Sequence, residues 1–271
     1  MDSIISYFEA LPNLPTHRAA YLFGGLFLFF MIENAIPLFR TTYNKTKHSA
    51  TNIFFTLTTI LVNFAMAGIL TLVAWWVETN AFGLLNWWQA STLIKFTVGL
   101  MDLIGAYAAH WIEHHIQWMW QFHVIHHTDQ HVDTTTANRH HPGESVIRFI
   151  FTTAAVLVIG APIWLIFLYQ TLSVILTQFN HSNLKIPNWL DRGMRLVICT
   201  PNMHRSHHHY RQPYSDSNYG NIFSFWDRIF GTYIIVDNSK LVYGVDTYMD
   251  KKEANNVMDL LKIPFAGYRQ P

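Results

Sequence analysis

Long apolar segments alternate with short polar connections over the first two thirds of the chain. Three of these segments cover residues 19–39, 53–77 and 93–109. A helix of about 17–25 residues spans the roughly 30 Å hydrocarbon core of a bilayer, so each segment is predicted to be a membrane-spanning helix. The first contains Glu33, which is costly in lipid and is therefore expected to face protein or water.

A fourth apolar region, residues 146–179, is too long for a single span. The sequence Gly-Ala-Pro at 160–162 interrupts it, and Gly and Pro close together typically end a helix. The region is therefore predicted to be a helical hairpin that enters the membrane and returns to the same side. This hairpin brings His181 to the side where the third segment ends at His110, whereas one long tilted helix would separate these two residues.

The loop charges orient the predicted spans. Three basic residues lie between positions 40 and 47, whereas residues 78–90 contain no Lys or Arg. By the positive-inside rule, the first of these loops is cytoplasmic, the second is outside, and the third span returns the chain to the cytoplasm. The predicted fold is thus an all-α integral membrane bundle of about four membrane-embedded helical units, one of them a hairpin. A cytoplasmic histidine-rich cap completes it.

Composition supports a membrane protein and narrows the chemistry. Only 13% of the residues are charged, against roughly 25% in a typical soluble domain, and the formal net charge of +1 excludes the basic footprint of a nucleic-acid binder. A single cysteine, Cys199, cannot form an internal disulfide or a thiolate metal cage. Histidine is the exception, because 14 of the 16 histidines lie between positions 110 and 209.

Nine of these histidines recur at spacings that place them on shared helix faces. The patterns are one H-x₃-H, two copies of H-x₂-H-H, and a lone histidine directly after the hairpin. Positions i, i+3 and i+4 share one face of a helix, and imidazole is a ligand for iron, zinc, copper and nickel. Nine converging imidazoles are too many for one ion and indicate two. They are His110, His114, His123, His126, His127, His181, His204, His207 and His208.

The first two clusters cannot face one site from a straight helix. At about 100° per residue, His123 lies about 180° around the axis from His114. The chain is therefore predicted to turn between Ile116 and Phe122, although no Gly or Pro marks a turn there.

Taken together, these patterns resemble the fatty acid hydroxylase/sterol desaturase superfamily. Two further segments are similar to that superfamily. Residues 139–144, Arg-His-His-Pro-Gly-Glu, contain its His-Pro-x-Glu element. Residues 218–233 contain Asn-Tyr-Gly-Asn and then Phe-Trp-Asp-Arg-Ile-Phe-Gly-Thr-Tyr. The resemblance covers about residues 100–235 and divides the chain into N-terminal membrane spans (1–109), a histidine-cluster catalytic domain (110–235) and a C-terminal polar tail (236–271).

The resemblance implies a non-haem di-iron oxygenase that hydroxylates or desaturates a C–H bond of a lipid with O₂. The nine clustered histidines are the implied iron ligands, and His141 of the His-Pro-x-Glu element is a candidate tenth. Water or an amide such as Asn180 could complete one iron. Because the last cluster is a triple, its ligating pair could instead be His208 and His209. Of the remaining histidines, His115 and His140 are weaker candidates for metal ligands. His17, His48 and His131 are not expected to bind metal.

Metal-bound histidines usually donate their second ring N–H to a neighbouring acceptor. The acidic candidates near the clusters are Glu113, Asp129, Asp133, Glu144 and Asp227. Basic residues near the clusters could hold a lipid phosphate, dock an electron donor or simply supply positive-inside charge. They are Arg139, Lys185, Arg205 and Arg211.

The chain has no flavin or nicotinamide fingerprint, so the electrons are expected from a partner of the ferredoxin, flavin or cytochrome type. The cytoplasmic ends of the spans suit this role, since a lipid can enter sideways and electrons can arrive from water. The last residues show no endoplasmic-reticulum retrieval signal, which favours a bacterial inner membrane over the endoplasmic reticulum.

Two other functions use the same histidines. A metal-handling or proton-coupled transporter should carry its binding groups near the bilayer midplane, whereas these clusters lie at span ends. A zinc hydrolase needs about three protein ligands and an open position, which leaves most of the histidines unexplained.

Overall fold

The computed structural model describes residues 2–40, 42–88, 97–250 and 252–269. The regular secondary structure of these residues is helical, with no β-strand and only isolated bridges among them. The α-helices are α1 (Asp2–Ala10), α2 (Pro15–Ala19), α3 (Gly25–Ala35), α4 (Lys45–Thr79), α5 (Leu84–Trp88), α6 (Thr97–Asp102), α7 (Ala109–His115), α8 (Gln117–His127), α9 (Pro142–Ile159), α10 (Ile163–His181), α11 (Asn188–Met194), α12 (Pro201–His207), α13 (Phe225–Ile229) and α14 (Val257–Lys262). The π-helical turns are η2 (Ala20–Gly24) and η4 (Leu103–Ala108), and the 3₁₀ turns are η1 (Leu11–Asn13), η5 (Thr134–Asn138), η6 (Asn238–Lys240), η7 (Asp246–Tyr248), η8 (Glu253–Asn255) and η9 (Ile263–Phe265).

Three described helices are long and apolar enough to cross a membrane: α9, α10 and the segment Lys45–Trp87, which contains α4. The predicted first span corresponds to Pro15–Ala35, where η2 joins α2 to α3 in one helical rod. The predicted third span begins at 93–96, outside the described residues, and continues through α6, η4 and α7. The prediction of an all-α membrane bundle is confirmed.

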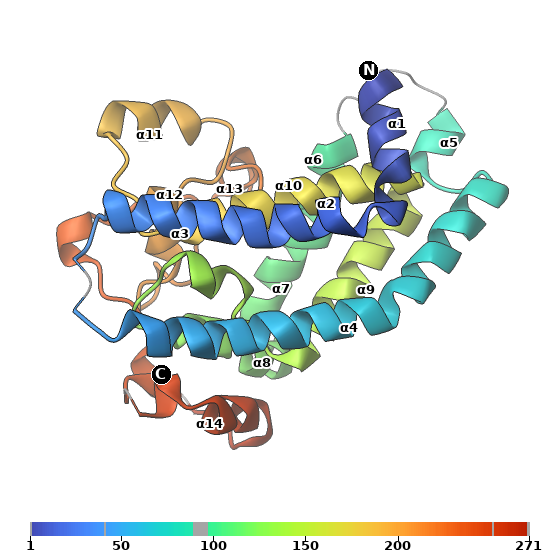
Figure 1. Ribbon diagram of the computed structural model, residues 1–271. Coiled ribbons are helices and arrows are strands. Elements are labelled where there is room, and N and C mark those ends of the chain that lie inside the picture. The colour runs from blue at the N-terminus through green and yellow to red at the C-terminus, as the bar shows by residue number, and fades with distance from the viewer. Residues whose placement is uncertain (1, 41, 89–96, 251, 270–271) are drawn as a thin grey trace.

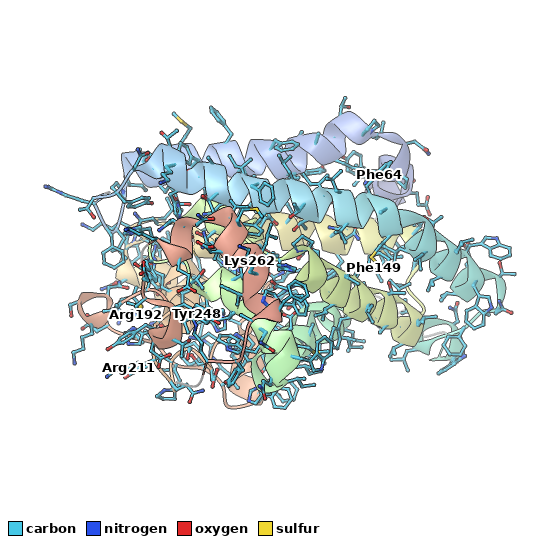
Figure 2. All side chains as sticks on the ribbon, turned by 90° about the horizontal axis from the view of Figure 1, so that it is seen from below. Phe64, Phe149, Arg192, Arg211, Tyr248 and Lys262 are labelled. Carbon is cyan, nitrogen blue, oxygen red and sulfur yellow. The ribbon has the colours of Figure 1, made fainter. Side chains whose placement is uncertain are left out.

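The bundle has a polar end and an apolar end. In Figure 1 the long helices α3, α4 and α10 run lengthwise, with α11, α12 and α13 at one end and α1 and α5 at the other. Figure 2 places Arg192 and Arg211 at the cap end and Phe64 in the apolar part. The side chain of Phe64 is 82% exposed, and exposed apolar side chains in such numbers along α4 are expected where lipid, not water, surrounds the helix.

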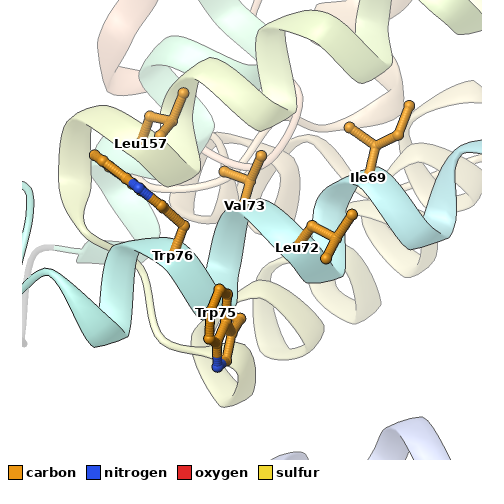
Figure 3. A pocket seen from close by; sticks show the side chains of 6 residues that line it. All are labelled: Ile69, Leu72, Val73, Trp75, Trp76 and Leu157. Atoms are coloured by element: carbon orange, nitrogen blue, oxygen red, sulfur yellow. The ribbon is translucent and has the colours of Figure 1, made fainter.

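An apolar groove lies between α4 and α9 in the part of the bundle away from the cap. Its volume is about 530 Å³. Two of the residues that line it, Trp75 and Trp76, are of the type that favours the membrane interface, where the ring lies among lipids and the N–H contacts water. The groove is lined by Ile69, Leu72, Val73, Trp75 and Trp76 of α4 and by Leu157 of α9 (Figure 3).

The predicted hairpin is confirmed. α9 ends at Gly160, whose φ of 75° is left-handed, and Pro162 precedes the first turn of α10. The turn at Gly83, with φ 97°, packs directly against it: a Cβ on Gly160 would lie 2.4 Å from the Phe82 carbonyl oxygen. The tip of the hairpin is therefore packed backbone to backbone on the turn that follows α4.

The predicted turn between the first two clusters is also confirmed, and it occurs at Ile116. This residue has extended backbone angles, φ −99° and ψ 111°, between the end of α7 and the start of α8. A β-branched residue favours the extended region, so the helix direction changes here without Gly or Pro.

α4 is longer than a bilayer is thick. Its 35 residues correspond to about 52 Å, and its first turns bury His48, Asn52 and Phe55 against the cap. The buried guanidinium of Arg139 ties this end together, since it donates to the Asn52 side chain and to the carbonyls of Ile125 and Ala254. The C-terminal segment thus packs on α4 and α8.

We expect Gly160→Ala to lower the free energy of unfolding by about 1–3 kcal/mol, because a Cβ in the left-handed region is strained and would also clash with the Phe82 carbonyl. The measurement is thermal unfolding of the detergent-solubilised protein. Gly68→Ala is the matched control, since nothing lies within 4 Å of its Cβ position and alanine favours a helix. Equal melting temperatures for the two variants would contradict the role of the hairpin turn.

Candidate metal centre

The nine clustered histidines form two adjacent groups. Within each group the ligand nitrogens all lie within 4.8 Å of one another. The five-histidine group consists of His110, His114, His123, His127 and His207. The four-histidine group consists of His126, His181, His204 and His208.

Helix geometry divides the histidines between the two groups. On α8, His126 and His127 are neighbours and so point about 100° apart; each belongs to a different group. At the end of α12, His207 joins the five-histidine group while His204 and His208, four residues apart, join the other. Each of the two H-x₂-H-H motifs therefore contributes histidines to both groups.

The inward nitrogens are as close as ligands of a shared ion. The Nε2 atom of His123 lies 3.1 Å from those of His110 and His127. In the other group, the Nε2 atom of His181 lies 3.0 Å from those of His126 and His204. Two nitrogens each about 2.1 Å from one metal ion are separated by roughly 3.0–3.4 Å, so both groups have the size of a metal site.

Hydrogen bonding shows which nitrogens lack a proton in the five-histidine group. The Nδ1 atom of His110 lies 3.0 Å from the Tyr219 carbonyl oxygen, and that of His123 lies 2.7 Å from the Glu144 carboxylate. A carbonyl only accepts, so Nδ1 carries the hydrogen and a neutral ring leaves Nε2 bare.

Burial lowers the pKa of His123 to about 3, so this ring is neutral at pH 7. Two bare nitrogens facing each other at 3.1 Å repel unless a cation lies between them. Neutral imidazole is also the form that binds metal, so these residues fit an ion.

Two of the five predicted acidic acceptors support the site. Glu144 accepts from His123 and pairs with Arg148, which also pairs with Glu113 at 2.8 Å. Asp227 accepts the backbone N–H groups of Tyr219 and Gly220 and so holds the segment whose carbonyl binds His110.

The other predicted acceptors have different partners. Glu113 lies 3.9 Å from the His123 Nδ1 atom, beyond hydrogen-bond distance. Asp129 and Asp133 both contact His48, which lies outside both groups, as predicted for an ordinary buried histidine.

Sequence reasoning missed one carboxylate that touches a clustered histidine. The Nδ1 atom of His114 lies 3.1 Å from Oδ1 of Asp216. Asp216 belongs to the loop between α12 and α13, about 100 residues away in the chain, so no local pattern could reveal the contact. The carbonyl partners of His207 and His181, Ser217 and Thr177, carry no side-chain signal at all.

His141 is the one predicted ligand that the structure does not bring to either group. Its Nδ1 atom accepts the Gly143 N–H at 2.9 Å, and the residue precedes the first turn of α9. The His-Pro-x-Glu element thus supplies a helix cap and, through Glu144, an acceptor. His209 also lies outside both groups, and its Nδ1 atom accepts the Val242 N–H.

The remaining candidates have other contacts. His140 lies beside the centre, with Nδ1 2.7 Å from Glu144, whereas His115 stacks on Trp111 and His131 stacks on Tyr43. The amide nitrogen of Asn180 donates to the Asn221 carbonyl.

Two of the four basic candidates are buried in structural roles. Arg205 donates to the carbonyls of Ser182 and Leu184, and Arg139 ties α4 to α8 as described above. Neither guanidinium is presented to a lipid headgroup or a partner. Lys185 and Arg211 are exposed.

Sequence comparison assigns the chain to a family. The sequence model of the fatty acid hydroxylase family matches residues 95–232, just over half of the chain. The chain belongs to the fatty acid hydroxylase family. The matched region of this family includes all nine clustered histidines and the acceptors Glu144, Asp216 and Asp227.

Curated relatives in this family are lipid-modifying enzymes by name. The chain is 32% identical to an alkylglycerol monooxygenase of Danio rerio over 59% of this chain and 33% of that protein. It is 31% identical to the alkylglycerol monooxygenase of Homo sapiens over 52% of this chain and 30% of that protein. It is 24% identical to an ornithine lipid hydroxylase of Rhizobium tropici over 67% of this chain and 54% of that protein. The chain thus spans about a third to a half of these relatives. No solved structure matches it significantly.

We expect His48→Ala to lower the free energy of unfolding by about 1.5–3 kcal/mol, because it removes hydrogen bonds to the buried Asp129 carboxylate. Its metal content should stay at the wild-type level, since His48 lies outside both groups. Melting temperature and elemental analysis of the purified protein measure the two effects. Loss of metal from folded His48→Ala protein would show that the assignment of His48 is wrong.

Proposed function

We propose that this protein is a membrane di-iron oxygenase that hydroxylates a C–H bond of a lipid, using O₂ and electrons from a partner protein. The observation that carries the proposal is the pair of adjacent imidazole groups, five and four histidines, buried at one end of a membrane bundle. The names of the relatives, alkylglycerol monooxygenase and ornithine lipid hydroxylase, support lipid as the substrate class and hydroxylation over desaturation.

The two groups are proposed to hold one iron ion each. Bound iron would supply O₂ reduction and the oxidising power to remove hydrogen from an unactivated C–H bond. Hydroxylation incorporates one oxygen atom into the lipid and releases the other as water, which consumes two electrons and two protons. Because the sequence carries no flavin or nicotinamide fingerprint, a ferredoxin-, flavin- or cytochrome-type partner is proposed to supply the electrons.

The chain's own residues orient the ligands and exclude water. The side chains of His123, His127, His207 and His208 are fully buried, which prevents bulk water from reaching the reacting centre. Glu144 and Asp216 each accept a ring N–H of a proposed ligand, which fixes the ring orientation and leaves the other nitrogen free for metal.

The site is proposed to lie on the cytoplasmic side. Its histidines come from the ends of α7 and α10 and from the cap helices α8 and α12, and the basic residues Lys45 and Lys47 lie in the first turn of α4 at the same end. A bacterial inner membrane is proposed over the endoplasmic reticulum, in line with the bacterial relative, half of whose length the chain covers. Location at helix ends also argues against a transporter, whose sites lie near the bilayer midplane.

The test is product formation in membranes supplied with iron, a reductant and isotopically labelled O₂. An alkylglycerol lipid and an ornithine lipid are offered separately, and lipid extracts are analysed by mass spectrometry. We expect a product with one labelled oxygen from wild-type membranes and none from His207→Ala membranes. His17→Ala is the matched control, because His17 is exposed, is hydrogen-bonded to Tyr7 and lies outside both histidine groups.

The iron content of the purified proteins tests the proposed metal centre independently of activity. The purified wild type should contain about two iron ions per chain, and the His207→Ala variant fewer. Full product formation by folded His207→Ala protein, or one tightly bound zinc in place of iron in the wild type, would contradict the proposal.

A further inference from the structure

The two histidine groups differ in how their outward nitrogens are held. In the five-histidine group, four of the five Nδ1 atoms are hydrogen-bonded, two of them to carboxylates. The partners are the Tyr219 carbonyl for His110 (3.0 Å), Asp216 for His114 (3.1 Å), Glu144 for His123 (2.7 Å) and the Ser217 carbonyl for His207 (2.6 Å). Only the buried Nδ1 atom of His127 has no partner.

The four-histidine group shows the reverse. His181 alone is held, by the Thr177 carbonyl at 2.8 Å. The Nδ1 atoms of His126, His204 and His208 are buried without a hydrogen-bond partner. Among the described residues, no carboxylate is hydrogen-bonded to an outward nitrogen of this group.

These differences act on the inward nitrogens. Where Nδ1 donates to a fixed acceptor, the hydrogen stays there and Nε2 is a bare, more basic ligand atom. In the four-histidine group, either His126 or His204 is free to carry its hydrogen on Nε2 and to donate it to Nε2 of His181, 3.0 Å away from each. One of these contacts can therefore be a hydrogen bond without an ion, and binding an ion would break it.

We propose that the two ion positions are inequivalent, and that Asp216 is a positioning residue for the tighter one. The five-histidine group binds its ion first and more tightly; the four-histidine group binds second, more weakly and exchangeably. Four nitrogens also leave more of an ion's coordination sphere open than five, so the second position is the one that admits an external ligand. This inference rests on the two-ion centre of the proposed function.

Asp216 is the best place to test this asymmetry. Its side chain is 31% exposed, in a surface loop, and Gln212 holds its other oxygen at 2.6 Å. Glu144, in contrast, is buried and also contacts Arg148 and His140, so its loss would disturb more than the His123 ring. Asp246 lines the same small surface pocket as Asp216 and His114 and provides a matched control of equal charge.

The experiment is a titration of the full-length, detergent-solubilised protein with Co²⁺ after the native metal has been removed with a chelator. Four-coordinate Co²⁺ absorbs visible light much more strongly than five- or six-coordinate Co²⁺. We expect weak bands during a first, tight phase and stronger bands during a second, weaker phase, with two ions bound at saturation. Near-ultraviolet circular dichroism and gel filtration confirm that each variant remains folded.

Single-residue variants show which histidine group binds Co²⁺ in which phase of the titration. Asp216→Ala should weaken the first phase about 10–100-fold and leave the second unchanged, and Asp216→Asn should lie between, because its amide oxygen still accepts from His114. Asp246→Asn should change neither phase. His126→Ala should abolish the second phase only, and His114→Ala should weaken the first.

Two results would overturn the inference alone, and a third would overturn it together with the proposed function. Binding of two ions in one phase, or an unchanged first phase in Asp216→Ala, would show that the positions are equivalent or that Asp216 plays no part, while the two-ion centre of the proposed function would stand. Saturation of the wild type at a single ion per chain would contradict the proposed function together with the inference.

Discussion

Bare imidazole nitrogens facing one another at about 3 Å are the constraint on which the rest of the structure depends. The Nε2 atoms of His110 and His123 lie 3.1 Å apart while both outward nitrogens are held by acceptors, so their two lone pairs repel unless a cation lies between the rings. Burial favours the neutral rings and also makes an unpaired polar group costly. The surrounding structure must therefore hold the rings in place and supply acceptors for their second nitrogens.

Three features of the fold meet this demand. The extended backbone of Ile116 turns α8 so that its histidines face those of α7. The hairpin returns α10 to the cap end, where its last residue, His181, enters the four-histidine group. The overlong α4 reaches past the bilayer to bury its first turns against the cap, where Arg139 joins it to α8 and the C-terminal segment. Each feature fixes one of the elements that carry the histidines.

Neighbouring histidines can serve different ions because a helix turns about 100° per residue. His126 and His127 on α8, like His207 and His208 at the end of α12, divide between the two groups. The groups then acquire unlike surroundings from the loops that cross them: the 216–219 loop supplies three acceptors to the five-histidine group and none to the other. In a dinuclear oxygenase, such a difference would separate a tightly held ion from an exchangeable one.

The sequence by itself determined the elements and the clustered histidines, because apolar length and helical spacing are local properties. The hairpin at Gly160, the turn near Ile116 and the isolation of His48 all follow from such local patterns. The tertiary structure alone decided how the nine histidines divide, why His141 caps a helix outside both groups, and which acids matter. Glu144 and Asp216 contact ring nitrogens, whereas Asp129 and Asp133 hold His48. Hydrogen bonds between residues more than a hundred positions apart depend on how helices pack, and packing leaves no periodic pattern in the sequence.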